Sequence, residues 1–218
     1  MHWTPDEDFH SFIQSMSPDV LDISYDPQVL EGQGSSPERN AGHCLLWAKT
    51  NAFLWDEAVP MKALLNMHLR FDGFLGFPGG LVKANETILE GVTREVLEEM
   101  AFKATQLDLT KDDFLCKMSI PDKKYVGQKL NLFFFTKQLT QQEFVLMEKK
   151  AMEAQHFGSE ILGNIRVPLH YWRQVDGFPR FLTHTFAGTA KAQLLLAICK
   201  NKMAEKGEIM AAYNLHHH

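Results

Sequence analysis

The apolar and polar positions of this chain alternate in short blocks that predict strands separated by helices. The strand-like blocks are short apolar runs bounded by glycine, proline or polar residues. They fall at residues 43–49, within 59–70, and at 113–120, 129–137 and 163–169. The block at 129–137, KLNLFFFTK, is apolar on both faces and predicts a central strand that is covered on both sides. Helical periodicity is expected after Thr87, over 140–155 and over 188–206. This order predicts an α/β fold, an α/β/α sandwich around a mixed β-sheet.

The helix expected after Thr87 carries two stripes of different character. Glu95, Glu98 and Glu99 fall within about 100° of one another on a helix, so that they form a carboxylate stripe. An apolar stripe of similar width lies beside it, made of Ile88, Leu89, Val92, Val96 and Met100. We expect the helix to dock by its apolar stripe and to hold the three carboxylates at the edge of a cleft.

Three carboxylates on one face repel one another unless a cation lies among them. Hard oxygen ligands suit Mg²⁺, Mn²⁺ or Ca²⁺, whereas zinc prefers nitrogen and sulfur. Arg94 lies beside the stripe and Glu86 precedes the helix, so that an Arg94–Glu86 ion pair is expected to fix the preceding loop. Thr87 and Glu90 have the spacing of a capping box. The alternative is a surface helix with a solvated acidic face.

The spacing of these residues resembles the box of the Nudix hydrolases. The matching positions are Gly80, Glu86, Arg94, Glu95, Val96, Glu98, Glu99 and Phe102, and the chain has Ala101 where the family usually has a glycine. The resemblance implies that Glu95, Glu98 and Glu99 bind the metal together with the backbone carbonyl of Gly79. It also implies that Glu95 or Glu98 acts as the catalytic base and that Arg94 orients both.

Flanking segments resemble the snoRNA-decapping Nudix subfamily, whose members also act as inosine diphosphatases. The segments are MHLRFDGFLGFPGG, HFGSEILGNIRVPL and FLTHTFAGTAKAQLL, within a likeness that runs from about His43 to Ile198. The resemblance implies that His43 contacts the base, Arg70 the phosphates, Phe77 the stacked purine and Gln193 the base edge. Glu160 is a candidate carboxylate for a second metal ion. One departure is that residues 103–155 contain no histidine, where the family has a histidine ligand near Met118 or Ser119.

Charge and composition divide the chain of 218 residues into three parts. Residues 1–40 hold eight acids and one base, mixed with proline, glycine and serine, and are expected to be a flexible or loosely packed extension. Residues 41–210 are the expected Nudix domain, and residues 211–218 are a tail whose histidines are native or come from an expression tag. The nearly neutral body does not favour a long nucleic-acid track. Cys44, Cys116 and Cys199 lack paired spacing, which is typical of reduced thiols inside a cell.

These observations favour a metal-dependent hydrolase that uses Mg²⁺ or Mn²⁺. The expected substrates are purine nucleoside diphosphates, such as inosine diphosphate, and the 5′ cap of RNA. ADP-ribose or dinucleoside polyphosphates are alternative substrates, and a catalytically weak RNA- or protein-binding homologue is the alternative function. No membrane segment is expected, because no apolar run reaches about 18 residues. A homodimer and a nuclear or cytoplasmic location are implied by the resemblance alone.

Overall fold

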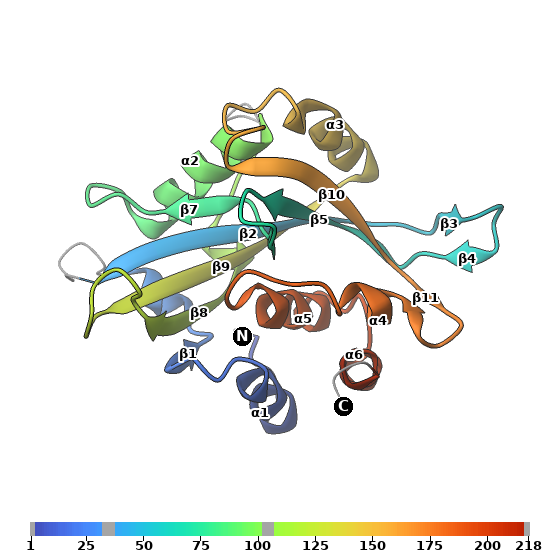
Figure 1. Ribbon diagram of the computed structural model, residues 1–218, viewed down its shortest axis with the longest axis horizontal. Helices are drawn as coiled ribbons and strands as arrows, with labels where there is room; N and C mark the ends of the chain where they lie inside the picture. Colours follow the sequence, from blue (N-terminus) through green and yellow to red (C-terminus); the bar gives the residue numbers. More distant parts are fainter. Residues whose placement is uncertain (1–2, 32–37, 102–106, 216–218) are drawn as a thin grey trace.

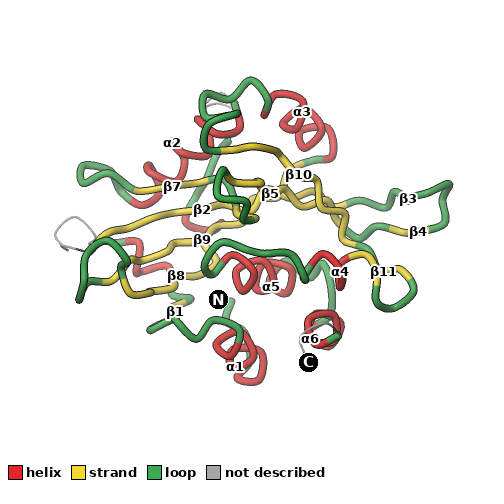
Figure 2. The backbone as a smooth tube through the Cα atoms, viewed as in Figure 1, coloured by secondary structure: helices red, strands yellow, loops and turns green. Residues whose placement is uncertain are grey.

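The protein is a mixed sheet covered by helices on both faces (Figures 1 and 2). The computed structural model describes residues 3–31, 38–101 and 107–215. The main strands, in sheet order, are β1 (Asp22–Ser24), β8 (Phe114–Pro121), β9 (Lys129–Leu139), β2 (Arg39–Lys49), β5 (Ala63–Arg70) and β10 (Ile161–Leu169). β6 (Leu75–Gly76) pairs with β5, and β7 (Gly79–Leu81) pairs with β2. The expected α/β/α sandwich around a mixed sheet is confirmed.

The helices, two short hairpins and two 3-10 turns make up the other elements of the fold. The helices are α1 (Glu7–Ser15), α2 (Ile88–Met100), α3 (Gln141–Ala151), α4 (Phe178–Phe181), α5 (Ala190–Lys200) and α6 (Lys206–Asn214). Two short hairpins pair β3 (Phe53–Leu54) with β4 (Val59–Pro60) and β11 (Tyr171–Trp172) with β12 (Asp176–Gly177). Single 3-10 turns occupy η1 (Pro27–Leu30) and η4 (Lys111–Asp113). Among the described residues, no helix is long and apolar enough to cross a membrane.

The centre of the sheet is the parallel pair of β2 and β9. Their register runs from Arg39 opposite Leu130 to Ala48 opposite Leu139. Phe133, Phe134 and Phe135 in β9 are completely buried. Phe134 packs in the cluster under α5, whereas its two neighbours pack in the cluster under α2 and α3. The prediction of a central, doubly covered strand is therefore confirmed.

Helices α2 and α3 cover one face of the sheet (Figure 1). Val92 and Val96 of α2 are fully buried against β2. A Cβ atom on Gly42 would lie 1.9 Å from Cγ2 of Val92, so this glycine lets the helix approach the strand. Gly91 has the same function toward the loop, because a Cβ atom there would lie 2.9 Å from both methyl groups of Val82.

The other face is covered by α5, with α1 and α6 outside it (Figure 1). The expectation of a loosely packed N-terminal extension is wrong for the described part of residues 1–40. Asp6 caps α1 by accepting a hydrogen bond from the N–H of Phe9 at 3.0 Å, and Phe9 and Ile13 are completely buried. Strand β1 pairs antiparallel with β8, so residues 22–24 belong to the central sheet. The apolar side of α1, formed by Phe9, Phe12 and Ile13, packs in the same cluster as residues of α5 and α6.

The C-terminal region also differs from the expectation. The single helix expected over 188–206 ends at Lys200, and Lys202 has a positive φ of 52° in the turn that follows. A separate helix, α6, continues to Asn214, so the boundary expected at residue 211 falls inside it. His216–His218 lie outside the described residues.

Candidate active site

The first turn of α2 is fixed by the capping box that the sequence predicts. The hydroxyl oxygen of Thr87 accepts from the N–H of Glu90 at 3.2 Å, and the Glu90 carboxylate accepts from the N–H of Thr87 at 2.8 Å. The two contacts satisfy backbone N–H groups that a helix start leaves without partners. The cap sets the phase of the helix, and with it the direction in which the later glutamates point.

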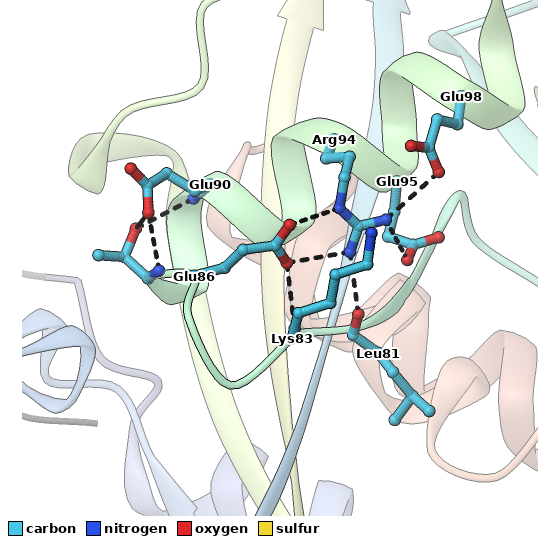
Figure 3. Close-up of polar contacts among 8 residues, drawn as sticks. Leu81, Lys83, Glu86, Glu90, Arg94, Glu95 and Glu98 are labelled. Atoms are coloured by element: carbon cyan, nitrogen blue, oxygen red, sulfur yellow. Dashed lines mark hydrogen bonds and ion pairs between the residues drawn. The ribbon is translucent and has the colours of Figure 1, made fainter. Parts of the chain in front are cut away.

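Arg94 is the centre of an ion-pair network on α2 (Figure 3). Its guanidinium donates to both carboxylate oxygens of Glu86, at 2.6 and 3.0 Å, and to the carbonyl oxygen of Leu81 at 3.2 Å. Its Nη1 also donates to Glu95 at 2.6 Å and to Glu98 at 3.3 Å. The hydrogen bonds from Arg94 lower the pKa of Glu86 to about 2. The expected Arg94–Glu86 pair is confirmed, and it fixes the loop before α2 against the helix.

Gly79 and Gly80 let the strand β7 lie directly against this network. A Cβ atom on Gly80 would lie 2.6 Å from Oε2 of Glu95. Gly79 has a φ of 141°, and a Cβ atom there would lie 2.1 Å from the carbonyl oxygen of Gly42. Gly79 therefore requires glycine, for contact and for backbone conformation, whereas a side chain at position 80 would displace the flexible end of Glu95. The role of the Gly79 carbonyl as a metal ligand stays a prediction.

Glu99 faces the sheet and differs from the other two glutamates. Only 7% of its surface is exposed, and its Oε2 accepts from the N–H of Gly79 at 2.8 Å. Burial raises its pKa to about 8, against the effect of the Gly79 hydrogen bond, and Glu95 and Glu160 raise it further. A buried carboxylate beside two others is stabilised in its ionised form by a nearby cation. The site therefore fits a positive charge next to Glu99.

His68 on β5 is a neighbour of Glu99 that the sequence analysis missed. Its Nδ1 lies 3.7 Å from Oε2 of Glu99, and its Nε2 lies 3.0 Å from the sulfur of Met100. Burial, and then the nearby His43, lower the pKa of His68 to about 3, so it is neutral at pH 7. The sequence pattern that could have predicted this neighbour is the alternation of side chains in the strand, since Leu64 and His68 both point to the α2 face.

The expected substrate-binding residues lie on several elements. His43 on β2 is opposite Gly79 on β7, and burial together with the charge of Arg70 lowers its pKa to about 4. The guanidinium of Arg70 forms a forked pair with Asp72, at 2.8 and 3.1 Å. Gln193 on α5 is only 3% exposed, and its Nε2 has no hydrogen-bond partner among the described residues.

Phe77, Met118 and Ser119 are less accessible to a substrate or a metal ion. Met118 and Ser119 lie near the position where the family has a histidine ligand. Phe77 is 6% exposed, and its ring packs on that of Phe134 at a centroid distance of 4.7 Å. Met118 is completely buried in the cluster under α5, and the Ser119 hydroxyl donates to Asn131 at 2.8 Å. Phe77 is therefore mainly a core residue, and neither Met118 nor Ser119 offers a free ligand.

The structure groups the acidic residues differently from the simple stripe. Within the described ranges, one group of three His, Cys, Asp or Glu ligand atoms lies mutually within 4.8 Å, formed by Glu99, His156 and Glu160. Glu95 and Glu98 are outside this group, and both carboxylates are bonded to Arg94. An open depression of the surface lies along α2, and Arg94 and Glu98 line it together with Leu97 and Leu109. Glu98 is therefore the glutamate of the stripe that faces an open space.

The chain is similar to several known proteins. A family model described as Nudt16-like, U8 snoRNA-decapping enzyme-like, matches residues 40–204. The U8 snoRNA-decapping enzyme of Xenopus laevis is 36% identical over 82% of this chain and 83% of the relative. The Tudor-interacting repair regulator protein of Homo sapiens is 33% identical over 89% of this chain and 88% of the relative.

Among solved structures, the Nudix domain of Shewanella oneidensis NrtR complexed with ADP ribose is similar over 83% of this chain and 95% of that chain. Its TM-score is 0.48 and its identity 14%. The family model, which matches residues 40–204, and the 36% identity to the Xenopus laevis enzyme define the chain as a Nudix protein. It belongs to the U8 snoRNA-decapping enzyme-like family, a family of Nudix pyrophosphohydrolases.

Proposed function

We propose that this protein uses Mg²⁺ or Mn²⁺ to hydrolyse phosphoanhydride bonds in purine nucleoside diphosphates, such as inosine diphosphate, and in the 5′ cap of RNA. The observation that carries the proposal is the position of Arg94, which holds Glu95 and Glu98 on the same helix as the buried Glu99. The relatives described as U8 snoRNA-decapping enzymes support the choice of RNA cap substrate.

The donor set fits a hard divalent cation, since Glu95, Glu98 and Glu99 offer carboxylate oxygens and the carbonyl of Gly79 offers another. Such an ion neutralises phosphate oxygens and makes a bound water more acidic. Glu98 is the better candidate for the base, because its side chain is 34% exposed and its contact with Arg94 is 3.3 Å. Glu95 is 15% exposed and lies 2.6 Å from the same guanidinium, which holds it as a ligand.

The recognition residues support a purine base. His43 is neutral at pH 7, so its ring offers both a donor and an acceptor to a base. The unpaired Nε2 of Gln193 is a buried donor whose lost hydrogen bond costs about 1–3 kcal/mol, which a base acceptor would recover. Arg70 would exchange part of its pairing with Asp72 for substrate phosphates. Phe77 contributes its small exposed edge to the purine.

The test compares Glu98→Gln with Glu90→Gln on the same helix. Substrates are inosine diphosphate, ADP-ribose and capped RNA, each with Mg²⁺ or Mn²⁺ and with products separated. We expect Glu98→Gln to lower kcat by at least about 10²–10⁴, the usual contribution of an acid–base group. Glu90→Gln keeps the capping box, because glutamine also fits its third position, and should keep the rate. Full activity in Glu98→Gln would refute the assigned site.

A binding function without catalysis is the second candidate, because relatives described as Tudor-interacting repair regulator proteins are also similar to this chain. Absence of hydrolysis of every substrate in the panel would favour it, and preference for ADP-ribose would change the substrate but not the site.

We further propose that the protein acts in the nucleus or cytoplasm as a homodimer. Light scattering coupled to size exclusion tests the dimer, and imaging of the tagged protein tests the location.

A further inference from the structure

We propose that a pocket at the C-terminal end of β2 binds a phosphate group. The pocket is partly enclosed, has a volume of about 280 Å³ and lies where the end of β2, the start of β5 and the turn after α5 meet. Trp47 lines it, and this residue is four positions along β2 from His43. Among the described residues that line the pocket, none is expected to bind metal or substrate, so the inference goes beyond the proposed function and does not rest on it.

Trp47 brings a buried hydrogen-bond donor without an acceptor to this pocket. The residue is 4% exposed, and its Nε1 is inaccessible to solvent and makes no hydrogen bond within the described part of the chain. An indole N–H can only donate, and a buried donor without an acceptor is rare in folded proteins. Met61 and Met203 line the pocket beside the indole, and a small shift of these flexible side chains brings a ligand oxygen to Nε1.

Lysine side chains give the pocket a positive charge. The described residues that line it include Lys49, Lys62 and Lys202 and no acidic residue. Lys62 donates to both carboxylate oxygens of Glu208 at 2.9 Å, so its charge is balanced. Lys49 and Lys202 are exposed, and neither forms an ion pair with another described residue. Two lysine charges therefore remain, which match the charge of about −1.5 to −2 that a phosphate group carries at pH 7.

The backbone at the end of α5 does not require a lysine at position 202. The N–H groups of Lys202 and Met203 donate to the carbonyl oxygens of Cys199 and Ile198, at 3.1 and 3.0 Å, so these carbonyls need no lysine side chain. Lys202 has a φ of 52°, in the left-handed region where a helix end usually has glycine. The charge that its side chain brings to the pocket explains a lysine at this position.

The donors of the pocket select an oxyanion. Thr50 also lines it and is 4% exposed, and its hydroxyl oxygen accepts from the N–H of Ala52 at 3.1 Å, which leaves the O–H as a donor. Ammonium, indole and hydroxyl donors together favour a ligand that is negative and rich in acceptors, as phosphate is. Small-molecule sites usually exceed about 300 Å³, so this pocket suits a small ligand. Inorganic phosphate and the phosphate of a mononucleotide are the two sources of this group.

The experiment follows the indole N–H resonances of the ¹⁵N-labelled full chain by NMR while inorganic phosphate or adenosine 5′-monophosphate is added at constant ionic strength. The chain has four tryptophans, and the resonance that disappears in Trp47→Phe is that of Trp47. Its dependence on ligand concentration gives the affinity of this pocket alone. The variants are Lys49→Gln and Lys202→Gly. The matched control is Lys123→Gln, an exposed lysine in the turn between β8 and β9, at the other end of β2.

We expect phosphate to shift the Trp47 resonance until it saturates and to leave the other three resonances in place. Lys49→Gln and Lys202→Gly should each weaken binding by roughly three- to fivefold, the usual contribution of an ion pair at a surface. Lys123→Gln should keep the affinity. Lys202→Gly should also raise the midpoint of thermal unfolding, because glycine adopts a positive φ without strain, so that weaker binding is separated from a loss of folding.

Saturation by inorganic phosphate alone or by the mononucleotide alone would support the site and identify the source of the phosphate group. Saturation by both would support a site for the group that they share. The inference would be overturned by a Trp47 resonance that neither ligand moves. Equal affinities in the unmodified protein, Lys49→Gln and Lys202→Gly would also overturn it. None of these outcomes depends on hydrolysis, which Glu98→Gln tests separately.

Discussion

Helices α2 and α5 lie on opposite faces of the same sheet and carry polar chemistry in opposite ways (Figure 1). On α2 the charged groups are many and are paired with one another, as Arg94 is with Glu95 and Glu98. On α5 most residues are buried and apolar, and Gln193 is a single buried amide with an unpaired Nε2. A shared face of charges is visible in the sequence as a period, whereas a lone amide in an apolar helix has no period, and only the structure shows that Gln193 is buried with an unpaired Nε2.

The largest expected effect concerns the cover of α5. Phe9→Ala removes a completely buried ring of α1, and substitutions of this kind cost about 3–5 kcal/mol in free energy of unfolding. Denaturant unfolding monitored by circular dichroism measures the loss. The control Phe53→Ala concerns a ring that is 52% exposed in the β3–β4 hairpin and should change stability by less than about 0.5 kcal/mol. Equal stability of Phe9→Ala and the unmodified protein would mean that α1 is not part of the α5 layer.

The next effect is the pH dependence of the folding stability, which arises on the α2 side of the sheet around Glu99. Gln193 on α5 is uncharged and does not contribute to it. Without metal, burial lowers the pKa of His43 to about 4 and of His68 to about 3, and raises that of Glu99 to about 8. In the unfolded chain the histidines titrate near about 6.5 and the glutamate near about 4.3. Between about pH 4.3 and about pH 6.5, the unfolded chain holds two protons on His43 and His68 that the folded protein lacks, and the folded protein holds one proton on Glu99 that the unfolded chain lacks. Stability should therefore rise with pH by about 1.4 kcal/mol per unit.

Above about pH 6.5 only Glu99 differs, and the folded protein keeps the proton that the unfolded chain releases. Stability should then fall until the pH reaches the folded pKa, about 8. Unfolding by denaturant with a chelator, at a series of pH values, should show a maximum near pH 6.5. Saturating Mg²⁺ should remove the decline on the alkaline side, because a cation favours the ionised carboxylate. A continuous rise in stability to pH 8 with the chelator would contradict the assignment to Glu99.

The smallest effect concerns the end of α2. Ala101 has the left-handed conformation, with φ 51° and ψ 32°, at the position where the family usually has glycine. Ala101→Gly should stabilise the protein by about 0.5–1 kcal/mol, because glycine adopts this conformation without a steric cost. The matched control Ala151→Gly, at the buried last turn of α3, should destabilise by about 1 kcal/mol. A loss of stability in both variants would mean that this helix end relaxes in solution.

The sequence predicted the parts of the fold whose signal is local. The capping box at Thr87, the pair of Arg94 with Glu86, and the buried β9 all follow from residues close together in the chain. The packing of α1 was missed, because its burial depends on α5 and α6 at the other end of the chain. Eight acids among the first forty residues hid the short apolar stripe.

The candidate site was predicted in part for the same reason. The period of three glutamates placed Glu95 and Glu98 beside Arg94, as the structure shows. It could not show that Glu99 turns inward to Gly79, because strand β7 defines that contact. The proximity of His156 to Glu99 depends on the turn before β10 and on its contact with Phe71, which no local pattern in the sequence indicates.

The parallel pairing of β2 with β9 affects how the protein is made on the ribosome. β2 emerges early, but its central neighbour is complete only when the chain has passed Leu139. The apolar side of α1, at Phe9 and Ile13, packs in a cluster with α5, which is synthesised still later. Such non-local contacts form slowly and leave apolar surface exposed meanwhile. A nascent chain stalled before β9 would therefore lack the centre of its sheet and would be a target for chaperones.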